Sequence, residues 1–360
     1  MDALTTLSIK KHTTLLNRFP ETRFVTQLAK NRASWIVFGH YLTPAQFEDM
    51  DFFTNRFNAI LEAWKVGNYE VALMEGELTS EHETILKALE LDYARIQDVP
   101  DLTKPGLIVL DMDSTAIQIE CIDEIAKLAG VGEEVAEVTE RAMQGELDFE
   151  QSLRLRVSKL KDAPEQILSQ VRATLPLMPE LPELVATLHA FGWKVAIASG
   201  GFTYFSDYLK EQLSLNYAQS NTLEIVNGKL TGQVLGEVVS AQTKADILLT
   251  LAQQYDVEIH NTVAVGDGAN DLVMMAAAGL GVAFHAKPKV EAKAQTAVRF
   301  AGLGGRRVYS FCCLDSSAKT ELAIEALSLE GLGEAQKSHV KTWLLLIWGG
   351  VQSVLRDAPL

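Results

Sequence analysis

The chain has 360 residues, of which 48% are hydrophobic and 22% are charged, and its formal net charge at pH 7 is -15. This length allows two or three domains, and the hydrophobic fraction is sufficient for a buried core. The acidic excess argues against nucleic acid or an anionic membrane as the main partner, because such surfaces are bound through an excess of Lys and Arg. A small phosphorylated substrate is not excluded, since it needs only a local positive site.

The cysteines and the termini predict a cytoplasmic protein. Cys121 is distant from the adjacent pair Cys312 and Cys313, so neither a disulfide framework nor a zinc spacing is present. Residues 1–19 lack the apolar region of a signal peptide. The most apolar stretch, Trp343–Leu355, is shorter than the roughly 18 residues of a membrane span. We therefore expect no membrane association.

The first part of the chain predicts a small α+β domain. Residues 1–22 show no clear periodicity and are expected to form a loose arm. The apolar patterns that follow predict a strand, a helix, a second strand and a second helix. These four elements are expected at Ala33–Leu42, Pro44–Trp64, Tyr69–Met74 and Thr79–Leu91.

This domain, residues 1–100, carries no catalytic motif. Its element order resembles the ACT-like regulatory modules that precede some amino-acid biosynthetic enzymes. A packing or dimerisation domain is an equally good interpretation, and a homodimer is one assembly that such a domain could support. The ligand or role of this domain stays open at this point.

A linker and a buried strand follow. Residues 98–106 contain two prolines and a glycine, which is typical of a linker. Leu107–Leu110 is a continuous apolar run, which predicts a strand buried on both faces. Four amphipathic segments between Cys121 and Leu175 predict short helices. Because these helices are inserted directly after the first strand, we expect them to form a cap.

After Pro179 the pattern returns to alternating strands and helices. Asn227 and Gly228 between two short strands predict a two-residue hairpin. Strands are expected at Trp193–Ala198, Thr262–Val265 and Leu280–Phe284, and helices at Phe202–Leu213, Gln242–Tyr255 and Asp271–Ala278. Such alternation predicts an α/β fold with a doubly wound parallel sheet, whose ligands bind beyond the carboxyl ends of the strands.

Two carboxylates emerge where the first buried strand ends. Asp111 and Asp113 are two residues apart, so an extended backbone directs both to the same side. Like charges this close repel each other unless a cation lies between them or one stays protonated. Such residues can also serve a turn or a helix N-cap.

Two further strand ends carry polar residues. Ser199 and Asp267 follow apolar strands, and Lys244 begins a helix between them. If the strands are parallel neighbours, these groups meet Asp111 and Asp113 at one edge of the sheet. Carboxylates, a hydroxyl and an ammonium are the groups that phosphoryl transfer through an aspartyl-phosphate requires.

The order of these motifs resembles the haloacid dehalogenase (HAD) superfamily of phosphatases. The resemblance rests on D-x-D-S-T at 111–115, on Ser199 and Lys244, and on GDGAND at 266–271. It implies a HAD-like, Rossmann-like core at 101–119 and 180–305 and a helical-bundle cap at 120–179. The remaining segment, 306–360, diverges.

Further segments are similar to the phosphoserine phosphatase family within this superfamily. They are ECIDEIAKLAG, RAMQGELDFEQSLRLRV, ASGGF, HAKP and NGKLTG. The resemblance implies Mg²⁺-dependent hydrolysis of O-phosphoserine, the last step of L-serine biosynthesis. It assigns the substrate's amino group to Glu120 and its carboxylate to Arg156, and leaves Arg154 at the surface. Met143 and Phe149 match apolar residues that close the cap.

The resemblance also implies the catalytic and metal-binding residues. Asp111 is the expected nucleophile, and Asp113 is the expected general acid and base. Mg²⁺ is expected on Asp111, on the main-chain carbonyl of Asp113 and on Asp267, because this cation prefers oxygen ligands.

A second group of residues is implied around the phosphate. Ser199, the amide of Gly200 and Lys244 are expected to hold the phosphoryl oxygens. Asn270 is expected on the substrate or phosphate side, and Asp271 is expected to orient Lys244 or the water bound to the metal.

Three alternatives are weighed. A HAD phosphatase could act on another small phosphomonoester, but sugar phosphates offer neither group that Glu120 and Arg156 would bind. A non-catalytic amino-acid sensor is disfavoured because every motif residue is present. A phosphorylating pump is excluded by Asp113 and by the lack of membrane spans.

The C-terminal segment has no identified counterpart. Leu322–Leu329 and Trp343–Leu355 could form a helical hairpin. Such a hairpin could pack on the core or mediate self-association, and the segment could also be a tail that arose from a changed reading frame.

Overall fold

A computed structural model describes residues 9–11, 13–25, 33–66, 68–96 and 99–301. The predictions for 306–360 lie outside these residues. The described chain divides into two compact units. The first contains the described residues up to Thr103 together with 179–191 and 298–301, and the second contains 104–178 and 192–297.

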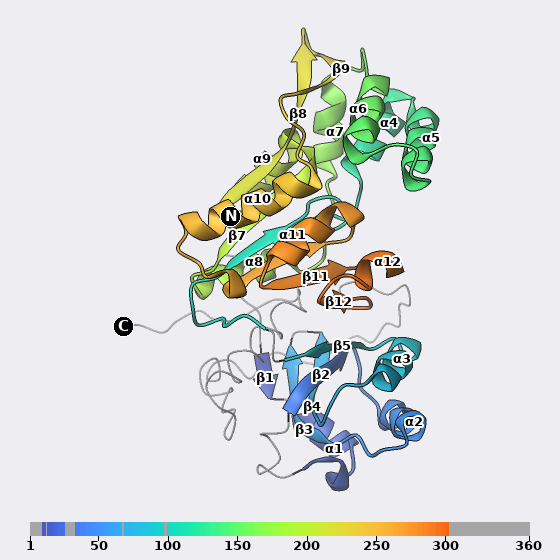
Figure 1. Ribbon diagram of the computed structural model, residues 1–360, viewed down its shortest axis with the longest axis vertical. Coiled ribbons are helices and arrows are strands. Elements are labelled where there is room, and N and C mark those ends of the chain that lie inside the picture. Colours follow the sequence, from blue (N-terminus) through green and yellow to red (C-terminus); the bar gives the residue numbers. More distant parts are fainter. Residues whose placement is uncertain (1–8, 12, 26–32, 67, 97–98, 302–360) are drawn as a thin grey trace, which may run out of the picture. The chain divides into compact units, whose positions relative to one another are not determined.

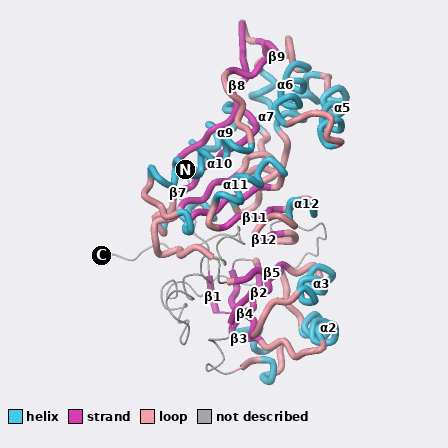
Figure 2. Tube along the Cα trace, in the orientation of Figure 1, coloured by secondary structure: helices cyan, strands magenta, loops and turns pink. Residues whose placement is uncertain are grey.

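The first unit contains a five-stranded antiparallel sheet with the order β1-β3-β4-β2-β5 (Figures 1 and 2). Its strands are β1 (Ile9–Lys11), β2 (Ala33–Gly39), β3 (Ile60–Val66), β4 (Tyr69–Glu75) and β5 (Asp92–Arg95). Its helices are α1 (Thr13–Arg18), η1 (Glu21–Arg23), α2 (Pro44–Thr54), α3 (Ser80–Ala88) and α8 (Leu181–Ala190).

The core of this unit lies between the sheet and its helices. Trp35 and Val37 of β2 are two residues apart and share one face of the sheet. They belong to one buried cluster with Phe47 and Met50 of α2 and Leu86 of α3. The unit is therefore the small α+β domain that the sequence predicts.

The helix expected over Pro44–Trp64 is shorter than predicted. It ends at Thr54, where Asn55 adopts a left-handed φ of 48°. Ile60 then begins β3, which lies between β1 and β4. The prediction counted aromatic residues such as Phe52 as a buried stripe, but Phe52 is 90% exposed. Spacing alone could not separate these exposed rings from the buried side chains of the next strand.

The loose arm expected for residues 1–22 is also wrong for the part of it that the structure describes, residues 9–11 and 13–22, because β1, α1 and the start of η1 lie there. Arg18 donates two hydrogen bonds to Glu70, at 2.6 and 3.0 Å. Arg23 contacts Asp51 at 2.6 Å. These partners are distant in sequence, so no local pattern could reveal that this segment is fastened to the domain.

The second unit contains a seven-stranded sheet with the order β12-β11-β10-β6-β7-β8-β9 (Figure 1). Its strands are β6 (Leu107–Leu110), β7 (Lys194–Phe202), β8 (Tyr217–Val226), β9 (Lys229–Leu235), β10 (Thr262–Gly266), β11 (Leu280–Phe284) and β12 (Thr296–Val298). Its core helices are α9 (Thr203–Leu213), α10 (Ala241–Gln254), η3 (Ile259–Asn261), η4 (Ala269–Asp271), α11 (Leu272–Ala277) and α12 (Pro288–Glu291). Strands β6, β7, β8, β10 and β11 pair in parallel, which confirms the doubly wound α/β expectation.

One face of the sheet packs on α10 and α11. Leu107 and Val109 of β6 share a buried cluster with Leu248 of α10 and Met275 of α11. The alternate residue Ile108 is also fully buried. A strand covered on both faces explains why the sequence shows a continuous apolar run here.

Four helices follow β6 in the chain, as expected for the cap. They are α4 (Cys121–Ala129), α5 (Gly132–Met143), α6 (Phe149–Lys159) and α7 (Gln166–Ala173). The β8-β9 hairpin turns at Asn227 and Gly228, both with positive φ, as predicted. It extends to the cap, where Leu230 exchanges backbone hydrogen bonds of 2.9 Å with Asp162 and Ala163. Among the described residues, no helix has the length and apolar character needed to cross a bilayer.

Candidate active site

The predicted convergence of strand ends is present at the carboxyl edge of the large sheet. β6 lies between β7 and β10, and Leu110 aligns with Ile197 and Val265. The residues that follow these strands therefore emerge side by side. Asp111 leaves β6, Ser199 lies near the end of β7, and Asp267 follows β10.

A buried lysine joins two of the predicted carboxylates. Lys244 Nζ lies 2.9 Å from Asp111 Oδ2 and 2.6 Å from Asp271 Oδ1. Asp271 Oδ2 accepts a second hydrogen bond, at 3.0 Å, from the amide of Gly268. Burial works to lower the pKa of Lys244, but the two carboxylates outweigh it and raise that pKa above its ordinary value. Lys244 therefore stays charged beneath the site.

Asp113 is held by the start of the first cap helix. The backbone N–H of Cys121 donates to Asp113 Oδ1 over 3.1 Å. Burial, with further contributions from Glu120 and Asp111, raises the pKa of Asp113 to about 8. Asp113 can therefore carry a proton at neutral pH, as a general acid must.

The carboxylates also form a group suited to a cation. Oxygen atoms of Asp111, Asp267 and Asp271 all lie within 4.8 Å of one another. Burial, followed by the charges of Asp111 and Asp271, raises the pKa of Asp267 to about 7. Buried like charges of this kind favour either a proton or a bound cation. An all-oxygen donor set fits a hard divalent cation.

Hydrogen bonds hold the segment Ser199–Gly201, which follows the apolar part of β7. Ser199 is buried, and its Oγ accepts a hydrogen bond of 3.0 Å from the amide of Gly201. Asn221 Nδ2 donates to the carbonyl of Gly200 over 2.8 Å, and its Oδ1 accepts from Val239 N. Sequence reasoning missed Asn221, because it lies in the polar run Gln219–Thr222, before the strand that the sequence predicts from Leu223.

Most of the predicted residues line one cavity of about 530 Å³. Lys244 and Asp271 do not reach it and lie buried beneath. The predicted residues in its wall are Asp111, Asp113, Glu120, Met143, Phe149, Arg156, Ser199, Gly200, Asp267 and Asn270. The wall also contains residues that sequence reasoning missed, including Ile122, Thr139, Leu147, Ser152 and Phe202.

The cap side of this cavity presents the carboxylate of Glu120 and the guanidinium of Arg156. Glu120 Oε1 accepts a hydrogen bond of 2.8 Å from Ser114 Oγ, a contact not anticipated from the sequence. Arg156 Nε is buried and has no hydrogen-bond partner among the described residues. A buried donor without a partner can bind a ligand that supplies an acceptor. Arg154, by contrast, pairs with Glu150 at the surface, as expected.

Apolar contacts join the cap to the core above the site. A Cβ atom placed on Gly200 would lie 2.5 Å from Cζ of Phe149, so this ring packs directly on the loop. Met143 is 58% exposed, and its Sδ accepts a contact of 3.5 Å from Lys287 Nζ. Phe149 therefore covers the phosphate side of the cavity more tightly than Met143 does.

Comparisons with known proteins agree with this geometry. The haloacid dehalogenase-like hydrolase family matches residues 105–279. The phosphoserine phosphatase of Vibrio cholerae serotype O1 is 96% identical over 305 residues, covering 85% of this chain and 93% of the relative. The phosphoserine phosphatase of Haemophilus influenzae is 53% identical, over 76% of this chain and 87% of its own length.

Solved structures give the same result. An unliganded probable phosphoserine phosphatase from Vibrio cholerae has a TM-score of 0.78 at 96% identity, covering 84% of this chain and 94% of that protein. A phospho-aspartyl intermediate analogue of phosphoserine phosphatase has a TM-score of 0.52 at 45% identity, over 54% and 94% of the two chains. Residues 31–95 match a domain of unknown function, DUF5609, so the ACT-like resemblance stays a prediction.

Proposed function

Because this chain belongs to the phosphoserine phosphatase family of haloacid dehalogenase-like hydrolases, we propose that it hydrolyses O-phosphoserine to serine and phosphate, the last step of L-serine biosynthesis. One observation carries the choice of substrate. The cavity that contains Asp111 and Ser199 also contains Glu120 and Arg156. Phosphoserine has a phosphate, an ammonium and a carboxylate, and the cavity offers a complementary group for each.

In the proposed reaction Asp111 attacks phosphorus, and the bond from phosphorus to the serine oxygen breaks. Asp113 gives its proton to that oxygen as it leaves, and then takes a proton from the water that hydrolyses the aspartyl-phosphate. The raised pKa of Asp113 supports the first of these roles. The charge that develops on the phosphoryl oxygens is stabilised by Ser199 Oγ, the Gly200 amide and the Lys244 ammonium.

The two ends of the amino acid are held by the cap in this proposal. The Glu120 carboxylate, oriented by Ser114, binds the ammonium, and the planar guanidinium of Arg156 binds the carboxylate through two N–H donors. Phe149 and Met143 cover the substrate and keep bulk water out until serine leaves. Asn270 lines the phosphate side, and Asp271 orients Lys244.

We propose Mg²⁺ as the cofactor, held by Asp111, the main-chain carbonyl of Asp113 and Asp267. When bound, the cation would neutralise charge on the phosphate and let an anionic nucleophile approach it. The clustered oxygen donors and the raised pKa of Asp267 support a hard divalent cation at this position. The predicted domain boundaries, a homodimer and a cytoplasmic location remain part of the proposal.

Phosphate release from matched substrates tests the function. O-phosphoethanolamine lacks the carboxylate, O-phospholactate lacks the ammonium, and glucose 6-phosphate lacks both. We expect turnover of phosphoserine that requires Mg²⁺ and is abolished by EDTA, with much lower kcat/KM for the other three. In the variant Arg156→Gln the preference for phosphoserine over phosphoethanolamine should largely disappear, while Arg154→Gln should retain it.

Three results would contradict the proposal. Equal kcat/KM for phosphoserine and glucose 6-phosphate would favour a phosphatase of another small phosphomonoester. Normal turnover by Asp111→Asn would exclude the aspartyl-phosphate route. The absence of any turnover, together with serine binding to the intact chain, would favour the amino-acid sensor.

A further inference from the structure

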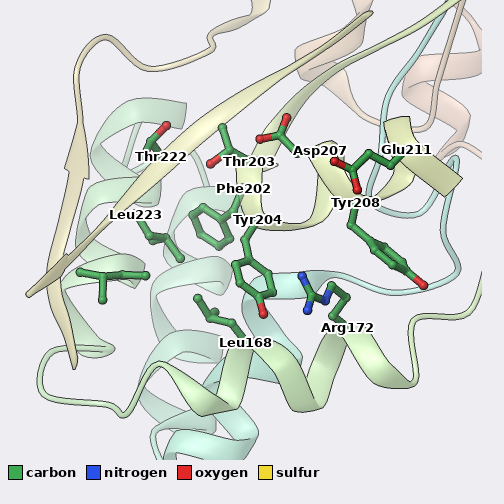
Figure 3. A pocket seen from close by; sticks show the side chains of 11 residues that line it. Leu168, Arg172, Phe202, Thr203, Tyr204, Asp207, Tyr208, Glu211, Thr222 and Leu223 are labelled. Carbon is green, nitrogen blue, oxygen red and sulfur yellow. The ribbon is translucent and has the colours of Figure 1, made fainter. Parts of the chain in front are cut away.

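A second cavity, of about 390 Å³, lies in the catalytic unit between the cap helix α7, the core helix α9 and strand β8 (Figure 3). No residue with a role in the proposed reaction lines it; Phe202, the last residue of β7, lines both cavities. Its lining consists of Leu168, Arg172, Phe202, Thr203, Tyr204, Asp207, Tyr208, Glu211, Thr222, Leu223 and Ile225. A volume above roughly 300 Å³ is sufficient for a small ligand.

One side of this cavity presents an unpaired guanidinium. Arg172 extends from α7 toward α9, where it lies 4.6 Å from the ring centre of Tyr204 and 5.4 Å from that of Tyr208 (Figure 3). Among the described residues, no carboxylate or carbonyl accepts a hydrogen bond from it. Contact with aromatic rings fixes the position of a guanidinium and leaves N–H donors at its edge for a carboxylate.

The other charged groups come from one stripe of α9. Asp207 and Glu211 are four residues apart, so they lie one above the other on the helix (Figure 3). Both are exposed, and neither forms an ion pair among the described residues. Two carboxylates and one guanidinium give this cavity a net charge of -1, which disfavours a doubly charged phosphate. A zwitterion with one carboxylate and one ammonium matches these charges.

The floor of the cavity is apolar. Leu168, Phe202 and Leu223 are buried side chains that border it. We propose that this cavity binds a free amino acid with an apolar side chain. Its carboxylate binds Arg172, its ammonium binds the Asp207 and Glu211 side, and its side chain packs on the floor.

The experiment must separate this cavity from the active site, because Glu120 and Arg156 also offer a carboxylate and a guanidinium. L-leucine is the probe for the new cavity, and L-serine is the probe for the active site. Isothermal titration of each probe is carried out on the full chain with Arg156→Gln and with Arg172→Gln. Thermal unfolding of both variants, and phosphoserine turnover by Arg172→Gln, report whether the fold is intact.

We expect leucine to bind the Arg156→Gln protein saturably with one site per chain. Arg172→Gln should weaken leucine binding by at least about tenfold, because a charge-assisted pair is lost. It should leave phosphoserine turnover unchanged. Arg172→Lys keeps the charge and the ring contacts but loses the two parallel N–H donors of the planar guanidinium, so it should also weaken leucine binding. This variant replaces Arg172→Gln in the experiment if Arg172→Gln fails to fold.

Two analogues test the orientation of the ligand. L-leucinamide lacks the carboxylate and should not bind, and 4-methylpentanoate lacks the ammonium and should bind more weakly than leucine. Asp207→Asn should weaken leucine binding but not that of 4-methylpentanoate. The proposal is overturned if no saturable leucine binding occurs, or if binding is lost in Arg156→Gln and retained in Arg172→Gln. The second result would assign all binding to the active site.

Discussion

Lys244 Nζ donates to Asp271 Oδ1 over 2.6 Å, and neither side chain is exposed to solvent. The same ammonium contacts Asp111, the proposed nucleophile, at 2.9 Å. Burial, followed by the charge of Asp111, raises the pKa of Asp271 to about 6, while Lys244 lowers it. The pair therefore lies beneath the cavity wall and holds the catalytic carboxylate in place from there.

Removing the charge of Asp271 should destabilise the protein and also lower its turnover of phosphoserine. Loss of one partner of a buried pair costs roughly 3–5 kcal/mol, and we expect about 3 kcal/mol for Asp271→Asn because Asp111 still pairs with Lys244. Urea unfolding measures this cost. Asp246→Asn, on the exposed side of α10, the helix that carries Lys244, is the control and should change the free energy of unfolding by less than about 0.5 kcal/mol. Equal stability of both variants would argue against a structural role for the pair.

Asp113→Asn should lower kcat for phosphoserine by about 10²–10⁴-fold, the usual contribution of a general acid or base. In this variant, the decrease in the rate of the first step, formation of the aspartyl-phosphate, should depend on the leaving group. p-Nitrophenolate leaves without a proton, so single-turnover release of nitrophenol from p-nitrophenyl phosphate should be much less affected than release of serine. Equal losses for both substrates would show that Asp113 does not protonate the leaving group.

Gly200→Ala should impair closure of the cap. Its Cβ would lie 2.5 Å from the Phe149 ring, so either the ring or the loop must move. We expect a higher KM and a lower kcat for phosphoserine, with partial recovery in the double variant Gly200→Ala with Phe149→Leu. In Gly132→Ala the new methyl group would meet Lys127 at an ordinary 3.6 Å, and steady-state kinetics should not change. Failure of the smaller side chain to restore activity would locate the damage in the loop itself.

Glu180 makes stability depend on pH. Burial, with the nearby charge of Glu183, raises the pKa of Glu180 from 4.5 to about 8. As pH rises, the unfolded chain therefore releases the Glu180 proton at a lower pH than the folded chain does. The free energy of unfolding consequently decreases as pH rises from about 4.5 to about 8. Glu180→Gln should match the parent protein in thermal unfolding at pH 4 and exceed it at pH 8. Glu133→Gln, an exposed change on α5, should show no such difference, and parallel pH profiles for all three proteins would contradict the prediction.

Much of the fold and of the candidate site could be predicted because the relevant signals are local. A strand buried on both faces must be apolar throughout, so Leu107–Leu110 was recognisable without its neighbours. Asp111, Ser199 and Asp267 each follow such a run, and the carboxyl ends of parallel strands necessarily meet at one edge. The hairpin at Asn227 and Gly228 is likewise encoded by two adjacent residues that tolerate positive φ.

Only the tertiary structure decided the features that depend on distant partners. The ion pair of Arg18 with Glu70 and the hydrogen bonds of Asn221 join segments that no local pattern connects. The end of α2 at Thr54 depended on which aromatic side chains the sheet would cover. The cavity at Arg172 exists because α7, α9 and β8 meet in space. Sequence therefore determined the chemistry carried by each strand end, and three-dimensional packing determined which groups were left without partners and are available to a ligand.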